Sequence, residues 1–454
     1  LLPDGKGGEK LFDTKESWRI LVAEYELQQL IKLGFNPKRL IIKESKMKKS
    51  KSHFITIKEV IKLEEKSDTY CFTEKKRNIG IFNGIVTGQC NEVNEYSDEH
   101  EYACCCLASI CLPKFIEDGE FKFNKLIDVC KTVINNLNKV IDDNYYPVPE
   151  TKKSNMLHRP LGVGIQGLSD VFSILKMPFD SPEAKQLNIE IFETLYYGCA
   201  VASMELSKRD GPYITYTKEN ALKHKNTFIE YFGEDIGMQK LNNLKDSPIS
   251  QGLFQFDLWN KTPTDRYNWD ELRQNIKLFG VRNSLFTALM PTASTSQIMG
   301  NNEAFEPVTS NIYVRRTIAG DFIVVNKHLI KDLTKLNLWS TELKDLIIAN
   351  QGSIQNIPNI PDNIKLLYKT VWEIKQKVII DMAADRGPYI CQTQSMNLFF
   401  NEPTFQLLTS ALFYAWKKGL KSGSYYIRSQ PKVAAQQFTI CLLYTSDAAD
   451  EEDS

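Results

Sequence analysis

The stretch Leu161-Gly162-Val163-Gly164-Ile165 is the part of this sequence that decides its fold. A short apolar run of this kind is typical of a buried strand. Apolar residues before it recur at helical spacing, and Ser181 and Pro182 after it suit the cap and first turn of a second helix. The first helical stripe consists of Leu126, Cys130, Val133, Leu137 and Val140, and the second of Leu187, Ile191, Leu195, Ala202 and Leu206.

The same alternation continues towards the C-terminus. The second helix is expected to stop at Gly211-Pro212, and a third helical stripe ends at Gly387-Pro388. Short apolar runs between helices occupy residues 285–290, 396–400 and 424–427. This alternation predicts an α/β architecture in which helices cover a sheet, although periodicity does not distinguish an open sheet from a barrel. The third stripe consists of Leu367, Val371, Ile374, Val378 and Met382.

Composition narrows the functional classes. The chain has 454 residues, 42% of them hydrophobic, and its 56 Lys and Arg balance its 56 Asp and Glu. This balance gives no support for nucleic acid or an anionic membrane as the main partner. No apolar run approaches the roughly 20 residues that span a bilayer. Ten cysteines, three of them consecutive, predict a reducing cytoplasm rather than a disulfide scaffold.

Several regions differ in character. We expect a piece of a longer protein, because the chain begins at Leu1 without an initiator Met or a signal-peptide pattern. Residues 1–80 are polar and irregular, and residues 217–248 are charged without a clear apolar stripe. The second of these regions is therefore predicted to be a surface insertion.

Cys90 and Glu92 form the first candidate catalytic pair, in the segment Gly88-Gln89-Cys90-Asn91-Glu92. Residues two apart point the same way in an extended chain, so a thiol and a carboxylate would face one substrate. An ordinary Glu has a pKa of about 4.3 and accepts a proton readily at neutral pH. The motif alone is weak, because Cys-x-Glu also occurs by chance on surfaces.

Cys105 belongs to the second candidate, the run Cys104-Cys105-Cys106. Buried apolar packing, a metal site and redox centres are all compatible with these thiols, and burial is the default for most of the ten cysteines. Zinc usually takes two spaced cysteine pairs, whereas adjacent cysteines do not present thiolates in tetrahedral order. Zinc is therefore the weaker interpretation.

The segment Met290-Pro291-Thr292-Ala293-Ser294-Thr295 follows an apolar run and precedes a possible helix start. Backbone N–H groups, hydroxyls and the helix dipole can bind an anion there. For such a segment alone, an ordinary Ser/Thr helix cap is the commoner role.

Tyr425 and Tyr426 lie in the last apolar run. Adjacent tyrosines in a strand normally point to opposite faces and pack there, so packing is the default. A functional pair would need a reason to keep two phenols in a continuous path.

Taken together, these segments resemble the large subunits of ribonucleotide reductases, in the same order and at similar spacing. The similarity runs from about residue 90 to about residue 440, is loose over residues 1–26 and nearly absent over 27–89. Several long motifs in register are far more specific than any one of them. The matching segments are Cys90-x-Glu92, residues 103–109, HRPLGVGIQGL at 158–168, PTAST at 291–295, GNNE at 300–303, TSNIY at 309–313, GSIQ at 352–355 and Tyr425-Tyr426.

The resemblance implies an α/β fold with a ten-stranded barrel around a finger loop, of which this chain lacks the N-terminal part. It implies that Cys90 becomes a thiyl radical, which removes the 3′ hydrogen of the ribose. Glu92 matches the carboxylate that takes the 3′-hydroxyl proton. Cys105 matches one of two cysteines that supply reducing equivalents and end as a disulfide.

The same resemblance implies a ribonucleoside diphosphate substrate, held through its phosphates by Pro291, Thr292, Ala293, Ser294 and Thr295. Tyr425 and Tyr426 match the pair that relays the radical from a metal-containing small subunit, and the adenosylcobalamin-dependent relatives need no such pair. The chain itself is expected to bind no metal or other cofactor. Thioredoxin or glutaredoxin is the implied reductant, a homodimer of large subunits the implied assembly, and the cytoplasm the implied location. ATP and deoxynucleotide effectors would bind through the N-terminal part that this chain lacks.

Gly88 is the main departure from the family pattern, which has Asn two residues before the radical cysteine. Glycine has no amide with which to hold the substrate and the carboxylate. The second reducing cysteine, the effector site and the mobile C-terminal cysteine pair have no match either. We therefore expect the chain as given to be inactive in nucleotide reduction, even when a small subunit is supplied.

The resemblance divides the chain into a divergent start at residues 1–89, the barrel domain at 90–440 and a tail at 441–454 that resembles translated cloning sequence. The leading hypothesis is a ribonucleoside-diphosphate reductase that makes DNA precursors. The alternative, favoured by Gly88 and residues 27–89, is an inactive paralogue or fragment that acts only as a structural partner subunit. A thiol-metal protein would leave the hydroxyl loop and the tyrosine pair unexplained.

Overall fold

The computed structural model describes residues 93–317 and 320–430 and the backbone of four short strands before them. The chain divides into two units, Leu1–Phe72 and Thr73–Ser454. Among the helices in these described ranges, none combines the length and the apolar character that a membrane crossing requires. The four short strands are β1 (Leu2–Pro3) and β2 (Glu9–Lys10), which pair in the first unit, and β3 (Ile79–Phe82) and β4 (Ile85–Gly88), which pair in the second.

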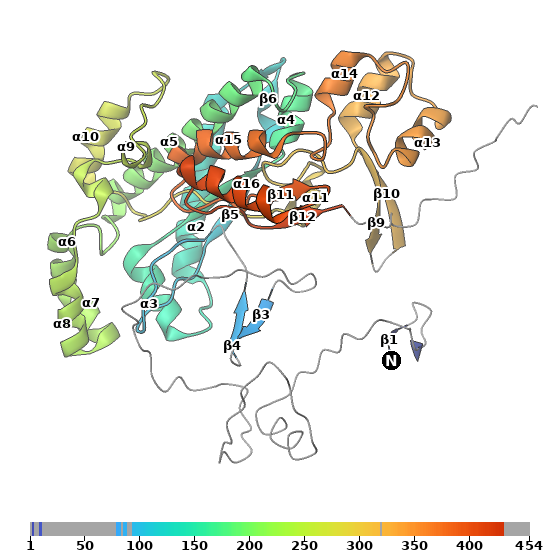
Figure 1. The fold of residues 1–454 in the computed structure, drawn as a ribbon. Coiled ribbons are helices and arrows are strands. Elements are labelled where there is room, and N and C mark those ends of the chain that lie inside the picture. The colour runs from blue at the N-terminus through green and yellow to red at the C-terminus, as the bar shows by residue number, and fades with distance from the viewer. Residues whose placement is uncertain are drawn as a thin grey trace, which may run out of the picture. The chain divides into compact units, whose positions relative to one another are not determined.

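Two parallel strands, β5 (Leu107–Cys111) and β8 (Gly162–Gln166), form part of the core of the second unit (Figure 1). Every residue of β8 is buried, which confirms the predicted strand. A Cβ atom at Gly162 would collide with the side chain of Leu107, and one at Gly164 would lie 2.6 Å from the Ala288 carbonyl oxygen. The glycines of this strand are therefore needed for close packing.

Further parallel segments extend the array on the β8 side. Val163 forms a parallel bridge with Thr287, and Leu289 forms another with Gln394. Beyond them β11 (Leu398–Phe400) pairs in parallel with β12 (Ile427–Ser429). The described residues thus contribute five parallel segments, around residues 107–111, 162–166, 285–290, 391–400 and 427–429, and the predicted α/β architecture is confirmed.

The long helices α2 (Phe123–Asp143) and α5 (Pro182–Asp210) pack against each other on this array. Ser181 caps α5 by accepting a hydrogen bond from the Ala184 amide at 3.1 Å, as predicted. The α2 stripe differs from the prediction, because Ile134 and Ile141 are fully buried whereas Val140 is 44% exposed. The face of α2 that is buried against α5 therefore contains Ile134 and Ile141 in place of the predicted Val133 and Val140.

The third predicted helix is wrong in its extent. The structure has α14 (Asp362–Leu367) and α15 (Gln376–Arg386), separated by turns. Val371 and Ile374, in the intervening turns, are buried although they are not helical. Apolar residues at this spacing can come from a buried loop as well as from a helix, and periodicity alone does not distinguish the two.

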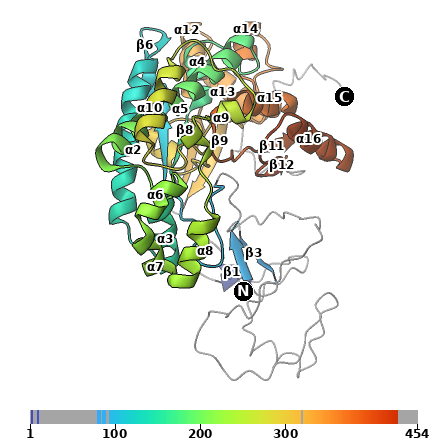
Figure 2. The same ribbon diagram turned by 90° about the vertical axis from the view of Figure 1, so that its left-hand side faces the viewer.

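Residues 217–248 form three short helices, α6 (Lys218–Lys223), α7 (Lys225–Phe232) and α8 (Glu234–Asn243). Figure 2 shows them beside α3 (Pro149–His158). They share a small buried cluster with Leu157 of α3, which consists of Leu157, Ala221, Phe228 and Leu241. Each of these short helices buries only one or two residues, so the sequence shows no apolar stripe.

A second small core lies under the antiparallel hairpin of β9 (Ile312–Thr317) and β10 (Gly320–Val325), together with α12 (Lys327–Lys335) and α13 (Thr341–Ala349). The remaining elements are η1 (Leu112–Phe115), β6 (Ile116–Glu117), β7 (Glu120–Phe121), α4 (Leu168–Ile174), η2 (Pro248–Gln251), α9 (Gln255–Leu258), α10 (Trp269–Phe279), α11 (Thr295–Met299), η3 (Gly387–Tyr389) and α16 (Phe405–Lys417).

Candidate active site

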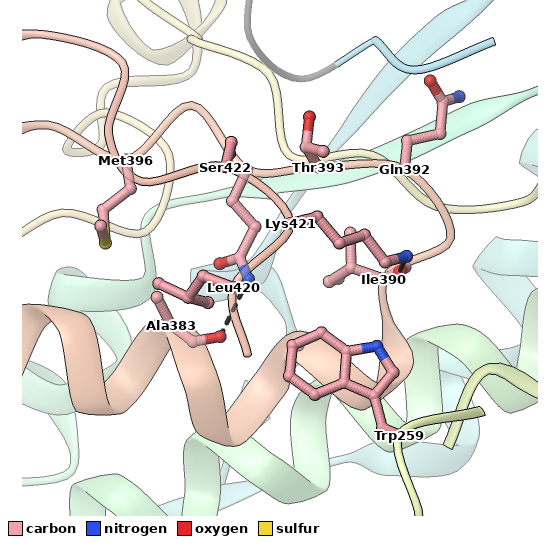
Figure 3. A pocket seen from close by; sticks show the side chains of 11 residues that line it. Trp259, Ala383, Ile390, Gln392, Thr393, Met396, Leu420, Lys421 and Ser422 are labelled. Carbon is pink, nitrogen blue, oxygen red and sulfur yellow. Dashed lines mark hydrogen bonds between the residues drawn. The ribbon is translucent and has the colours of Figure 1, made fainter. Parts of the chain in front are cut away.

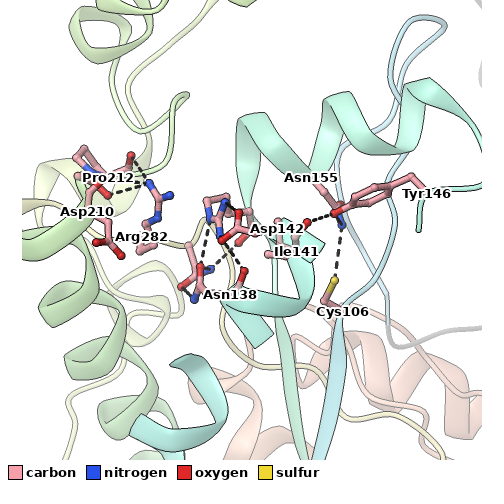
Figure 4. Close-up of polar contacts among 12 residues, drawn as sticks. Cys106, Asn138, Ile141, Asp142, Tyr146, Asn155, Asp210, Pro212 and Arg282 are labelled. Atoms are coloured by element: carbon pink, nitrogen blue, oxygen red, sulfur yellow. Dashed lines mark hydrogen bonds and ion pairs between the residues drawn. The ribbon is translucent and has the colours of Figure 1, made fainter. Parts of the chain in front are cut away.

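Cys105 lies two residues before β5, between Cys104 and Cys106. Cys106 is buried, Cys104 is half-buried and Cys105 is exposed, as expected where successive side chains alternate in direction. Burial raises the pKa of Cys106 to about 12, and its sulfur accepts a hydrogen bond from Asn155 Nδ2 at 3.6 Å (Figure 4). Of the three thiols, Cys105 is the most accessible to a reductant.

Three further predicted catalytic residues, Gly88, Cys90 and Glu92, precede residue 93 in the chain. Cys90 and Glu92 lie outside the described residues, so their approach to Cys105 stays a prediction. Gly88 is the last residue of β4, where its backbone is opposite Ile79. Within the described ranges no group of three His, Cys, Asp or Glu residues is placed to hold a metal ion.

Glu95 and Gln392 form a contact that no sequence motif indicated. Gln392 Nε2 donates to Glu95 Oε1 and to the Leu161 carbonyl oxygen, both at 3.1 Å, and Gln392 Oε1 accepts from the Asn94 amide at 2.9 Å. Burial raises the pKa of Glu95 to about 7, although the hydrogen bond from Gln392 opposes this shift. The contact anchors the segment that leads from Glu92 to Cys105 over the start of β8. Gln392 lies among polar residues before the apolar run 396–400, so no local pattern marked it.

Arg159 holds the chain at the entrance to β8. Its guanidinium donates to Asp142 at 2.7 and 3.1 Å and to the Asn138 carbonyl oxygen at 3.0 Å. The Arg159 carbonyl oxygen accepts from Asn283 Nδ2 at 2.9 Å, which ties this turn to the next parallel segment. Figure 4 shows Asn138 and Asp142 in this network. The Arg of the 158–168 motif is therefore a structural residue in this chain.

The hydroxyl loop at residues 291–295 follows the segment 285–290 and leads into α11. Thr292 is buried, and its Oγ1 accepts a hydrogen bond from the Ala304 amide at 2.7 Å. Pro291, Ala293, Ser294 and Thr295 are exposed, and the Ser294 side chain makes no cap bond to α11. Thr292 thus fixes the loop, while its neighbours face outward.

Tyr425 and Tyr426 lie side by side, which corrects the expectation of opposite faces. Their ring centroids are 4.0 Å apart and their planes meet at 47°. Both residues precede β12, so the alternation of a strand does not separate them. The Tyr426 hydroxyl is buried and has no hydrogen-bond partner among the residues that the structure describes.

A small pocket lies between the segment 390–396 and residues 420–422 (Figure 3). Lys421 Nζ donates to the carbonyl oxygens of Ile390 and Cys391 at 2.8 and 2.7 Å and to Gln255 Oε1 at 3.0 Å. Burial lowers the pKa of Lys421. These bonds hold the chain that leads into Tyr425 against the parallel array.

The parallel array and the motifs described above indicate the protein family to which the chain belongs. Residues 85–426 match the family model of the ribonucleotide reductase barrel domain, and the chain belongs to that family. It is 48% identical over 365 residues to the ribonucleoside-diphosphate reductase large chain of Schizosaccharomyces pombe and 49% identical over 385 residues to the large subunit of Arabidopsis thaliana. Each alignment covers 80% of this chain, and 41% and 44% of the respective relative, so the chain spans less than half the length of these relatives.

A solved structure supports the same fold. The alpha subunit of the class Id ribonucleotide reductase of Actinobacillus ureae superposes with a TM-score of 0.52 at 26% sequence identity. The match covers 75% of this chain and 52% of that one.

Proposed function

We propose that this chain is the barrel part of the large, catalytic subunit of a ribonucleoside-diphosphate reductase. The complete protein would reduce ribonucleoside diphosphates to deoxyribonucleoside diphosphates in the cytoplasm. The observation that carries the proposal is the contact between Tyr425 and Tyr426 directly before β12, at the same edge of the parallel array as Cys105 before β5.

In the proposed reaction, a Cys90 thiyl radical removes the 3′ hydrogen and Glu92 accepts the 3′-hydroxyl proton. The 2′-hydroxyl leaves as water, and a hydrogen takes its place. Cys105 and a second thiol from outside this chain lose two electrons and two protons and end as a disulfide. The 3′ hydrogen then returns from Cys90, which regenerates the radical. Enclosure of the site protects the carbon radical from water.

The parallel array supports a proposed position for the substrate. The loop 291–295 comes after a strand segment, whereas Cys105 comes before one, so the two lie at opposite edges. Five strand residues span roughly 16 Å. A nucleoside diphosphate held at the loop by its phosphates would extend across the array towards Cys105. The exposed hydroxyls of Ser294 and Thr295 support this assignment.

A metal-containing small subunit is the proposed radical source. The relay needs a partner close to the tyrosine pair, and α16 lies nearby, since a Cβ atom at Gly423 would lie 3.1 Å from Leu412. Phe405, Phe413 and Trp416 of α16 are 58–86% exposed, which supports a partner surface. Thioredoxin or glutaredoxin would reduce the disulfide, and large subunits would pair as homodimers that respond to ATP and deoxynucleotides.

The alternative of a non-catalytic paralogue is not favoured, because the relatives above are named as reductases. Gly88 and residues 27–89 are the features that motivated this alternative.

The cysteine assignment gives a direct test in the complete protein that carries Gly88→Asn, assayed with its small subunit. Cys105→Ser should abolish multiple-turnover formation of deoxynucleotide, because the disulfide no longer forms. Cys104→Ser is the matched control and should retain most of the activity. Loss of activity in the Cys104 variant with full activity in the Cys105 variant would reject the assignment.

A further inference from the structure

Glu306 and Asn397 form a buried contact that the reaction above does not use. Glu306 is 9% and Asn397 8% exposed. Asn397 Nδ2 donates to Glu306 Oε1 at 2.6 Å, and the Asn397 amide donates to the same oxygen at 3.3 Å. The two residues are 91 positions apart in the chain. They therefore join two segments that are far apart in the sequence.

On one side, this contact reaches the tyrosine pair. Asn397 Oδ1 accepts a hydrogen bond from the Tyr426 amide at 3.1 Å. The neighbouring bonds between these segments are made by backbone alone, from Tyr425 to Met396 at 2.6 Å and from Leu398 to Tyr426 at 2.9 Å. Of these three hydrogen bonds, the one from the Tyr426 amide has a side-chain acceptor.

On the other side, the contact reaches the hydroxyl loop. Glu306 comes two residues after Ala304, whose amide donates to Thr292 Oγ1 at 2.7 Å. The Glu306 carbonyl oxygen accepts from Asn302 Nδ2 at 2.6 Å, and the Asn302 amide is bound by Asp170 at 2.7 Å. Glu306 therefore sits on the same rigid segment that fixes the loop.

The contact is costly to break. A buried acceptor that loses its donor keeps its full desolvation penalty. Burial raises the pKa of Glu306 to about 7, while Arg428 and Asn397 act in the opposite direction. The carbonyl oxygen of a protonated carboxyl still accepts from an amide, so the Asn397 bond is compatible with both protonation states.

We propose that Glu306 and Asn397 are positioning residues that hold Tyr426 in place relative to the phosphate-binding loop. The inference rests on the proposed function, in which Tyr426 carries the radical and the loop holds the substrate. Through this contact the two sites, which are far apart in the sequence, keep one fixed geometry.

An exchange of the two side-chain types tests the proposal. Asn397→Asp removes the amide donor and places two carboxyl groups in contact. Glu306→Gln alone keeps an acceptor for Asn397 and removes only the charge. The double variant Glu306→Gln/Asn397→Asp restores one amide and one carboxylate with the polarity reversed, so a donor again meets an acceptor and Tyr426 keeps its partner. Asn311→Asp is the control, since Asn311 is a buried asparagine that binds the Gly352 and Tyr368 carbonyl oxygens elsewhere.

The first measurement is amide hydrogen exchange of the peptide 425–429 in the full chain. Asn397→Asp should speed exchange of the Tyr426 amide about tenfold, because the new carboxylate no longer binds Glu306, is repelled by it and moves away from the amide that it would otherwise accept from. Glu306→Gln should change it less than about threefold, and the double variant should return towards the parent rate. Exchange at the parent rate in Asn397→Asp, or no recovery in the double variant, would overturn the proposal. If Asn397→Asp does not fold, recovery of folding together with slow Tyr426 exchange in the double variant supports it.

The second measurement is turnover of the complete protein that carries Gly88→Asn, assayed with its small subunit. Asn397→Asp should lower kcat about tenfold with KM for the nucleotide unchanged, and the double variant should recover kcat. Asn311→Asp should leave both unchanged in the folded fraction. Absence of turnover in the parent protein would reject the proposed function, whereas the exchange measurement would still decide the positioning role.

Discussion

The phenol rings of Tyr425 and Tyr426 lie in contact, with centroids 4.0 Å apart, although the two residues are neighbours in the chain. This contact arises because both precede β12 and because Asn397 and Met396 bind their amides. A buried hydroxyl without a partner, as Tyr426 has among the described residues, calls for an explanation other than packing. Radical relay supplies one.

The hydroxyls of the pair should be essential for turnover and unimportant for substrate binding. In the complete protein carrying Gly88→Asn, Tyr425→Phe and Tyr426→Phe should each abolish deoxynucleotide formation, because a phenol can lose an electron and a proton and Phe cannot. Tyr426→Phe should change the free energy of unfolding by less than about 0.5 kcal/mol, since no described partner is left unsatisfied. A Tyr426→Phe variant that still turns over would show that the pair is structural.

Substitutions in the hydroxyl loop should affect either phosphate binding or protein stability, depending on whether the side chain is exposed or buried. Ser294→Ala/Thr295→Ala should weaken pyrophosphate and nucleoside diphosphate binding in calorimetric titration, with little change in stability, because both side chains are exposed. Thr292→Val should instead lower the free energy of unfolding by about 1–3 kcal/mol, because the buried Ala304 amide loses its acceptor. Unchanged affinity in the double alanine variant would reject the phosphate role.

Glu95 should make stability depend on pH. Its pKa is raised from 4.5 to about 7 in the folded protein, so between these values the folded state binds more protons than the unfolded state. Stability linked to Glu95 is therefore present below about pH 4.5 and is lost as the pH rises through 7. Relative to the parent, Glu95→Gln should gain up to about 2 kcal/mol between pH 5 and pH 8, allowing for partial exposure. Denaturant unfolding at both pH values measures this gain, and parallel pH profiles would contradict it.

Lys240 should be the anchor of the helices at 217–248. Its Nζ binds Glu101, which is 3% exposed, at 2.7 Å, and also Asp98 at 2.5 Å. Lys240→Met should lower the free energy of unfolding by about 2 kcal/mol, because the buried Glu101 carboxylate loses one of its partners and keeps His158. Lys223→Met is the control, since its pair with Glu219 is exposed and should contribute less than about 0.5 kcal/mol. Equal losses of unfolding free energy in the two variants would show that the Lys240–Glu101 contact contributes no more than an exposed ion pair.

The order of the motifs in the sequence was enough to predict the family and the α/β class. Local chemistry also predicted particular elements, because Ser181 and Pro182 suit the start of α5 and the run 161–165 is typical of a buried strand. Such features depend on neighbours in the chain, which the sequence displays directly.

Tertiary structure decided the rest. It selected Ile134 and Ile141 over Val133 and Val140, because the position of α5 determines which face of α2 is buried. The site contacts Glu95–Gln392 and Glu306–Asn397 join residues 297 and 91 positions apart, and no local pattern encodes such a pairing. The raised pKa values of Glu95 and Glu306 follow from burial by distant segments, so the fold, and not the local sequence, sets the chemistry of these two groups.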